Sequence, residues 1–137
     1  MSFLPQTNNQ ELENYSISER YVQKSSQILK NSEYFTKEQS SMIHAKAVSN
    51  YHFLKEGSWE TDFTDRYSTC GYIEKAENKI EIYIRLFGKS ESWQNLPFAI
   101  AYEFARIYLD FNPPKNDYVI EHERITDEFL NLLSDSF

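Results

Sequence analysis

The N-terminal half of the chain spaces its apolar residues as amphipathic helices do. Ser16 and Glu19 stand three positions apart, the spacing of a capping box, so we predict that a helix begins at Ser16. Apolar residues then recur every three or four positions up to Leu29, which extends this helix to about residue 31. Residues 1–15 are largely polar, and we expect them to be frayed.

A second helix is predicted after Thr36. This residue and Gln39 repeat the capping-box pattern. The apolar positions that follow at helical spacing are Ile43, Ala47, Tyr51 and Leu54. The helix should stop before Gly57, so residues 16–57 are expected to form a helical N-terminal part.

The middle of the chain has the alternating pattern of strands. Residues 58–66 show no sustained period and are predicted to be a loop, whereas residues 67–74 and 79–87 are predicted strands. The residues of the second strand that face one way are Ile80, Ile82, Ile84 and Leu86. Residues 75–78 are short enough for a hairpin loop, so we expect antiparallel pairing, with the isoleucine face against helices.

Two further helices are predicted in the C-terminal half. Asn95 can cap a helix whose first turn holds Pro97, where a missing amide hydrogen costs little. This helix is apolar around much of its girth, so it should be central and buried, and it ends near Phe111, before two prolines. A last helix is expected from about Val119, and its inward residues should be Ile125, Phe129, Leu132 and Leu133.

These elements predict an α+β fold with N-terminal helices, a small antiparallel sheet, a central buried helix and a C-terminal helix. The chain has 137 residues, 40% of them hydrophobic, which fits a single domain over residues 1–137. No apolar run reaches the length of a membrane span, and residues 1–10 lack a secretory signal, so we expect a cytoplasmic protein that does not enter a membrane. Cys70 is the only cysteine, which leaves no disulfide within the chain and no thiolate cluster for a metal.

Charge limits the kinds of partner. The chain has 21 acidic and 14 basic residues, a net charge of −7, which disfavours direct binding to a nucleic-acid backbone. Much of the excess lies in the C-terminal helix, on Glu121, Glu123, Asp127 and Glu128. These acids form either a solvated helix face or a surface that meets a basic partner or imitates nucleic acid.

The run AYEFAR, residues 101–106, has the spacing of the H-E-x-x-H motif of zinc peptidases. Glu103 holds the position of the acid, but Tyr102 and Arg106 stand where the two histidines would be. A guanidinium has only hydrogen-bond donors and repels a divalent cation, and a neutral phenol is a poor ligand. We therefore predict no metal, no cofactor and no catalytic residue, with these three side chains as the remnant of a site.

Residues 67–133 resemble the ImmA/IrrE-type zinc metallopeptidases, a zincin-like family in which a hairpin leads into an F-x-x-A-H-E-x-x-H helix and then an acid-bearing helix with a Phe. The residues at the corresponding positions are Phe98, Ala101, Glu103 and Phe129. In active members, as the resemblance implies, the two histidines and an acid of the later helix bind zinc, while the glutamate of the motif activates water. Glu121 and Glu123 are the candidates for that later acid.

We hypothesise that Arg106 takes the place of the metal. Its guanidinium would pair with Glu121 or Glu123 and so tie the central helix to the last one. In the alternative, Arg106 reaches solvent and Tyr102 only packs against its neighbours.

Three functions remain open. The first is a catalytically inactive metallopeptidase-like regulator that binds another protein, and the resemblance implies a phage or mobile element with a repressor or host factor as the partner. The second is an acidic inhibitor whose C-terminal helix occupies the basic channel of a host nucleic-acid enzyme. The third is an enzyme, either a metallopeptidase with unusual ligands or a hydrolase that uses Glu103.

Two tryptophans are the candidate interface anchors for a binding function. Trp59 and Trp93 both lie in predicted loops, and exposed tryptophans are frequent anchors of protein interfaces. In the alternative, both pack into the core of the domain. The sequence indicates no particular oligomeric state.

Overall fold

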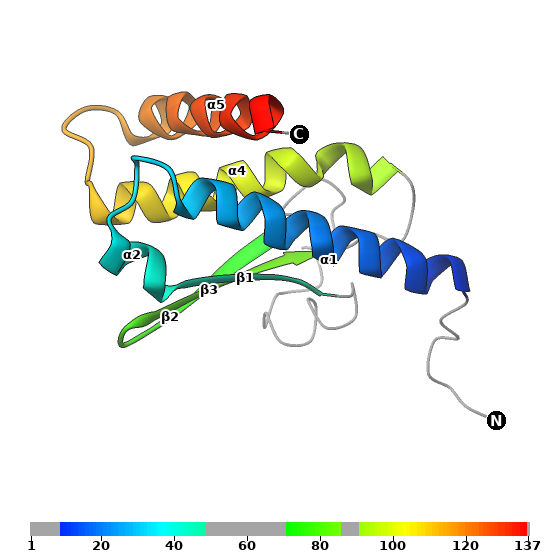
Figure 1. The fold of residues 1–137 in the computed structure, drawn as a ribbon. Helices are drawn as coiled ribbons and strands as arrows, with labels where there is room; N and C mark the ends of the chain where they lie inside the picture. The colour runs from blue at the N-terminus through cyan, green and yellow to red at the C-terminus, as the bar shows by residue number, and fades with distance from the viewer. Residues whose placement is uncertain (1–8, 49–70, 86–90, 137) are drawn as a thin grey trace, which may run out of the picture.

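The computed structural model of the chain describes residues 9–48, 71–85 and 91–136. Their elements in chain order are α1 (Asn9–Lys30), α2 (Lys37–Met42), β1 (Ile43–Val48), β2 (Gly71–Ala76), β3 (Lys79–Arg85), α4 (Glu91–Phe111) and α5 (Tyr118–Ser136) (Figure 1). The predicted α+β class is confirmed. Within these ranges, none of the helices combines the length and apolar character that a bilayer crossing requires.

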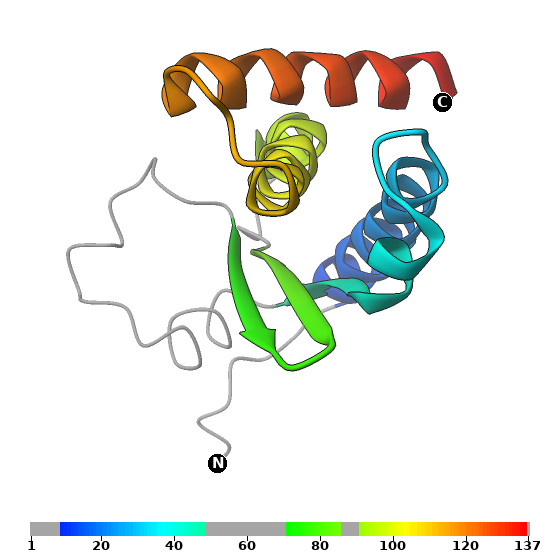
Figure 2. The ribbon, with the colours of Figure 1, turned by 90° about the vertical axis from the view of Figure 1, so that its left-hand side faces the viewer.

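The elements are stacked in layers with α4 at the centre. Figure 2 looks along α4 and shows it between α5 above and the hairpin of β2 and β3 below, with α1 to one side. The helix α5 crosses over α4 steeply rather than running beside it. This arrangement confirms the prediction that the apolar helix after the hairpin is central.

The sheet has three strands in the order β1-β3-β2. The hairpin prediction is confirmed, because β2 and β3 pair antiparallel, with Ile73 opposite Ile82. The loop is shorter than predicted, since Ala76 pairs with Lys79 and only Glu77 and Asn78 remain unpaired between the strands. Asn78 has a φ of 61°, in the left-handed region that asparagine tolerates better than most residues.

The prediction of a long second helix is wrong. The capping box is present, because the Gln39 amide nitrogen lies 3.0 Å from Thr36 Oγ1 and the reciprocal contact is also made. The helix α2 nevertheless ends at Met42, and β1 pairs in parallel with β3. Ile43 and Ala47 are four residues apart, a spacing that suits one face of a strand as well as one face of a helix. Tyr51, Leu54, Cys70 and the predicted loop 58–66 lie outside the described residues.

Two helices begin earlier than predicted. The helix α1 starts at Asn9 instead of Ser16, since the residues between include strong helix formers. The helix α4 starts at Glu91 instead of Asn95. Pro97 therefore lies inside α4, beyond its first turn. The predicted end of α4 at Phe111 is confirmed, and α5 begins one residue before the predicted start.

One core joins the sheet to the helices. Inward side chains of β1 and β3 alternate with exposed or half-buried ones such as His44 and Glu81. The strand residues of this core cluster are Ile43, Ala45, Ala47, Ile80, Ile82 and Ile84, and the helical residues of the cluster include Val22, Leu29, Ile100, Phe104, Ile107, Ile125 and Phe129. Val48 and Tyr83 are buried as well, so the alternation is incomplete in both strands. On α5, Ile125, Phe129 and Leu133 are buried as predicted, whereas Leu132 is only half-buried.

Side chains of α1 satisfy backbone groups along the outer edge of β1. Gln23 Nε2 donates to the Ala45 carbonyl oxygen at 2.6 Å, and the Ala47 amide donates to Glu19 Oε2 at 2.7 Å. Lys30 Nζ also donates to the Ile43 carbonyl oxygen at 2.7 Å. An edge covered in this way is a poor template for pairing with another strand. Glu19 thus binds the sheet edge and does not cap the start of α1.

We predict that Gln23→Ala lowers the free energy of unfolding by about 1 kcal/mol, because it leaves the carbonyl of the buried Ala45 without its donor. Urea unfolding would measure the loss. Gln27→Ala is the matched control, since Gln27 is exposed on the same helix and the two changes have the same effect on helix propensity. Equal losses in both variants would contradict a role for Gln23 at the strand edge.

Candidate functional site

The remnant site lies on α4, where its three side chains differ sharply in exposure. Glu103 is 1% exposed, whereas Tyr102 is 38% exposed and the Arg106 side chain is 43% exposed. Arg106 Nη1 donates to Glu103 Oε1 at 2.8 Å, a contact between residues three apart on one helix. The carboxyl group therefore lies inside the protein, with a guanidinium between it and the solvent.

The buried carboxyl group of Glu103 titrates near neutral pH. Burial raises its pKa to about 7, because a charged carboxylate is poorly solvated in the interior. The positive charge and the hydrogen bond of Arg106 act in the opposite direction and offset only part of this increase. Both the protonated and the ionised forms are therefore populated around pH 7.

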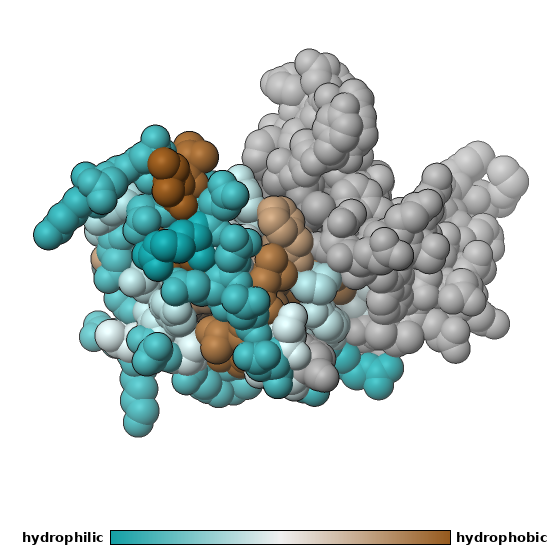
Figure 3. Space-filling model, turned by 90° about the horizontal axis from the view of Figure 1, so that it is seen from above, coloured by the Kyte–Doolittle hydropathy of each residue, from teal (hydrophilic) through white to brown (hydrophobic). Residues whose placement is uncertain are grey.

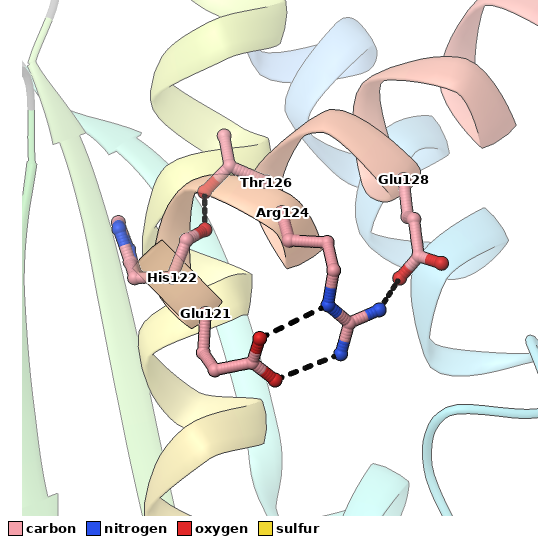
Figure 4. A network of polar contacts seen from close by, with 5 residues as sticks. All are labelled: Glu121, His122, Arg124, Thr126 and Glu128. Atoms are coloured by element: carbon pink, nitrogen blue, oxygen red, sulfur yellow. Dashed lines mark hydrogen bonds and ion pairs between the residues drawn. The ribbon is translucent and has the colours of Figure 1, made fainter. Parts of the chain in front are cut away.

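The hypothesis that Arg106 pairs with an acid of α5 is wrong. Its ion pair is with Glu103, and Glu121 binds the guanidinium of Arg124 instead, with Arg124 Nη2 3.0 Å from Glu121 Oε1. Arg124 Nη1 also contacts Glu128 Oε2 at 3.2 Å, so Arg124 lies between two carboxylates of its own helix (Figure 4). Spacings of three and four residues bring these groups together without a partner from α4. Glu123 is exposed.

A histidine that the sequence analysis did not select joins the two helices. His122 of α5 is 8% exposed, and its Nε2 lies 3.0 Å from the Tyr102 carbonyl oxygen. A carbonyl only accepts hydrogen bonds, so Nε2 carries the proton. Burial lowers the pKa of His122, the contact with the Tyr102 carbonyl opposes this, and the charge of Arg106 lowers the pKa further.

The helical spacing contains the signal that would have found His122. It precedes Ile125 by three residues and Phe129 by seven, so it shares the inward face of α5. Thr126 lies on the same face, and its Oγ1 donates to the His122 carbonyl oxygen at 2.7 Å (Figure 4). A buried polar side chain needs a hydrogen-bond partner, and for the His122 ring that partner is the backbone of α4.

Large apolar side chains are exposed around the contact between α4 and the start of α5. We call this the α4–α5 apolar surface, and it consists of Phe98, Tyr102, Tyr118, Val119 and Ile120. Its rings adjoin through His122, because the Tyr102 and His122 centroids are 4.2 Å apart and those of Tyr118 and His122 are 5.8 Å apart. Phe98 follows at 5.7 Å from the Tyr102 ring. Figure 3 looks down on α5 and shows apolar residues, in brown, interrupting the hydrophilic surface.

The remaining predicted site residues either lie at the surface of α5 or fall outside what the structure describes. Trp59 and the side chain of Trp93 lie outside what the structure describes, although position 93 belongs to α4 and not to a loop. Asp127 is exposed and Glu128 is half-buried. Within the described ranges, no group of three or more His, Cys, Asp or Glu side chains is placed to hold a metal ion.

We predict that Glu103→Gln stabilises the protein, and more so at about pH 8 than at about pH 5. The folded-state pKa of about 7 exceeds the ordinary glutamate pKa of 4.5, so the contribution of Glu103 to stability is complete below pH 4.5 and is lost as pH rises through 7. Above pH 7 the ionised carboxylate costs the fold about 3 kcal/mol, and an uncharged amide avoids that cost. Urea unfolding at both pH values measures the difference. Glu123→Gln is the exposed control, and a gain independent of pH would contradict the prediction.

We predict that Arg106→Gln lowers the free energy of unfolding by about 1 kcal/mol at about pH 8, a value reduced for the exposure of the guanidinium. The loss should disappear in a Glu103→Gln background, because the carboxylate that Arg106 stabilises is then absent. A double-mutant cycle by urea unfolding measures this coupling, with Arg124→Gln as a control that should not couple to Glu103. An equal loss in both backgrounds would show that Arg106 acts through packing alone.

Comparison with known proteins identified no relative of this chain. No protein-family model, no curated protein and no solved structure matches the chain. The resemblance to the ImmA/IrrE-type metallopeptidases therefore stays a prediction from residues such as Phe98, Ala101 and Glu103.

Proposed function

We propose that this protein is a catalytically inactive, zincin-like regulator that acts by binding another protein. The observation that carries the proposal is the α4–α5 apolar surface, whose five large side chains are between 38% and 70% exposed. Exposed apolar side chains that lie close together mark a surface that a partner covers, and the rings of Phe98, Tyr102 and Tyr118 adjoin through His122. Aromatic side chains, which make up three of the five, are enriched at such interfaces.

The chemistry of the remnant site supports binding without catalysis. Glu103 is buried and hydrogen-bonded to Arg106, so neither water nor a substrate has ready access to it. A general base has to come within hydrogen-bond reach of the proton that it removes. Arg106 in turn cannot bind a metal cation, because a guanidinium offers no lone pair. A metallopeptidase with unusual ligands, or a hydrolase that uses Glu103, is therefore supported less well.

The resemblance to the ImmA/IrrE-type metallopeptidases suggests the kind of partner. The hairpin of β2 and β3, then α4 with Phe98, Ala101 and Glu103, then α5 with Phe129 follow the order of that family. Members of the family, as the resemblance implies, act on the repressors that keep phages and mobile elements silent. The partner we propose is accordingly a repressor or host factor that a phage or mobile element encounters in the cytoplasm.

The alternative of an acidic inhibitor has weaker support. It relies on four carboxylates of α5 acting as one negative surface, but Glu121 and Glu128 both bind Arg124. A carboxylate paired within its own helix contributes less to the field outside the protein. Glu123 and Asp127 are the acids of this set that remain exposed without such a pair among the described residues.

We predict that changing Val119 and Ile120 together to serine abolishes binding to the partner. Both side chains are more than half exposed, so the variant should keep the unfolding midpoint of the unaltered protein. Affinity capture from the native host, followed by quantitative mass spectrometry, measures the effect. A partner recovered with the unaltered protein should fall by about tenfold or more with the double variant, a loss of about 1.4 kcal/mol.

Asn131→Ser is the control for this capture experiment, since Asn131 is exposed on the same helix and has no apolar side chain. It should leave the recovery of the partner unchanged. Identical sets of proteins with the unaltered chain and the Val119 and Ile120 double variant would contradict binding through the α4–α5 apolar surface.

A further inference from the structure

The acids of α5 divide into two groups according to whether a base accompanies them. On one side of the helix, Glu121 and Glu128 hold Arg124 between them (Figure 4). The pKa of Glu121 is lowered chiefly by its hydrogen bond from Arg124. This side of α5 therefore already contains the cation that its carboxylates attract.

The other group adjoins the exposed apolar residues. Val119, Glu123 and Asp127 follow one another at four-residue spacing, so each lies about 40° around the helix from the one before. Ile120 precedes Asp127 by seven residues and lies about 20° from it. All four side chains are exposed. They form one stripe, which we call the α5 stripe, with apolar residues at its start and carboxylates along its length.

Among the described residues, no base pairs with the carboxylates of the α5 stripe. Within the described part of the chain, neither Glu123 nor Asp127 makes an ion pair or a side-chain hydrogen bond. Arg124 is the basic residue of α5, and both of its recorded partners are on the other side. The stripe is thus locally negative as well as apolar.

A partner that covers Val119 and Ile120 also removes water from the carboxylates beside them. Losing the hydration of a carboxylate without gaining a cation costs several kcal/mol, so a neutral or acidic partner would lose much of what the apolar contact contributes. A lysine or arginine of the partner would offset this cost at Glu123 and Asp127. The net charge of −7 also speeds the approach of a positively charged partner.

A second copy of the chain does not meet this requirement. In a two-fold dimer through the α5 stripe, the same surface faces itself, so Glu123 and Asp127 would approach like charges. The nearest base on the helix, Arg124, is already bound to two carboxylates. Charge therefore favours a different protein over a second copy.

We infer that the α5 stripe binds a basic amphipathic segment of a partner protein. Apolar residues of that segment cover Val119 and Ile120, and its lysines or arginines meet Glu123 and Asp127. An amphipathic helix that places apolar and basic residues on adjacent faces has this chemistry. The inference rests on the proposed function, since it describes the partner of the same surface.

The test uses a synthetic peptide of defined composition as the probe. A blocked peptide of leucine and lysine, about 14 residues long with its leucines on one helical face, is compared with a counterpart that has glutamate for lysine. Amide chemical shifts of the full-length protein locate the binding, and calorimetry near physiological salt measures the affinity. The lysine peptide should perturb residues 118–127 and bind at least about tenfold more tightly than the glutamate peptide.

Matched variants separate the local acids from the overall charge. Glu123→Gln with Asp127→Asn should weaken the lysine peptide by about tenfold, whereas Glu121→Gln with Glu128→Gln, which removes the same charge on the other side, should change its affinity less than about twofold. Equal weakening by both pairs would overturn the inference, because the total charge would then account for binding. Shifts confined to other helices would overturn it as well.

The outcomes also distinguish this inference from the proposed function. If both peptides bind the same surface equally well, the requirement for a basic partner is wrong, but binding through the apolar surface stands. If changing Val119 and Ile120 to serine leaves the affinity of the lysine peptide unaltered, the surface itself is not the binding site and both proposals fail.

Discussion

The burial of α4 is the constraint on which the rest of the structure depends. This helix contacts α1, α5, β2 and β3, so nearly its whole circumference is covered by other elements. Ala101, Phe104, Ala105 and Ile107 are completely inaccessible, and small alanines allow the neighbouring helices to come close. Any polar residue on α4 must therefore either find a partner inside the protein or lie on the narrow strip that remains exposed.

The two charged residues of the remnant site illustrate both cases. Glu103 faces inward, and its pKa rises because the interior solvates a carboxylate poorly. Arg106 lies one turn further on, where its guanidinium reaches solvent and still donates to that carboxylate. The half-exposed guanidinium of Arg106 thus stabilises the ionised form of the buried Glu103 carboxyl group, and both residues belong to α4. The hydrogen bond between the helices is made by other groups, the His122 ring and the Tyr102 backbone.

The covering of α4 by α5 also determines which residues are left exposed. The inward face of α5 carries Ile125, Phe129 and Leu133, whereas Tyr118, Val119 and Ile120 at its start are between 44% and 70% exposed. Apolar residues exposed at the surface reduce solubility, so a cluster of them usually marks an interaction site. Their position beside unpaired carboxylates gives that surface a definite chemical preference, for a partner that is apolar and basic at once.

The sequence by itself determined the elements whose hydrophobic pattern is compatible with only one type of secondary structure. The alternating isoleucines of β3, the apolar girth of α4 and the proline-rich end after Phe111 all predicted the structure correctly, because each reflects local backbone geometry and burial. The apolar spacing of the segment that begins at Ile43 is compatible with both a helix and a strand. Only pairing with β3 decided that it is a strand. The same limit applied to His122, because its hydrogen bond to the Tyr102 carbonyl depends on how α5 crosses α4, which is set by side-chain packing between elements and not by spacing along the chain. The contact between Arg106 and Glu103 follows from their spacing of three residues, but the burial that raises the pKa of Glu103 was decided by the tertiary structure.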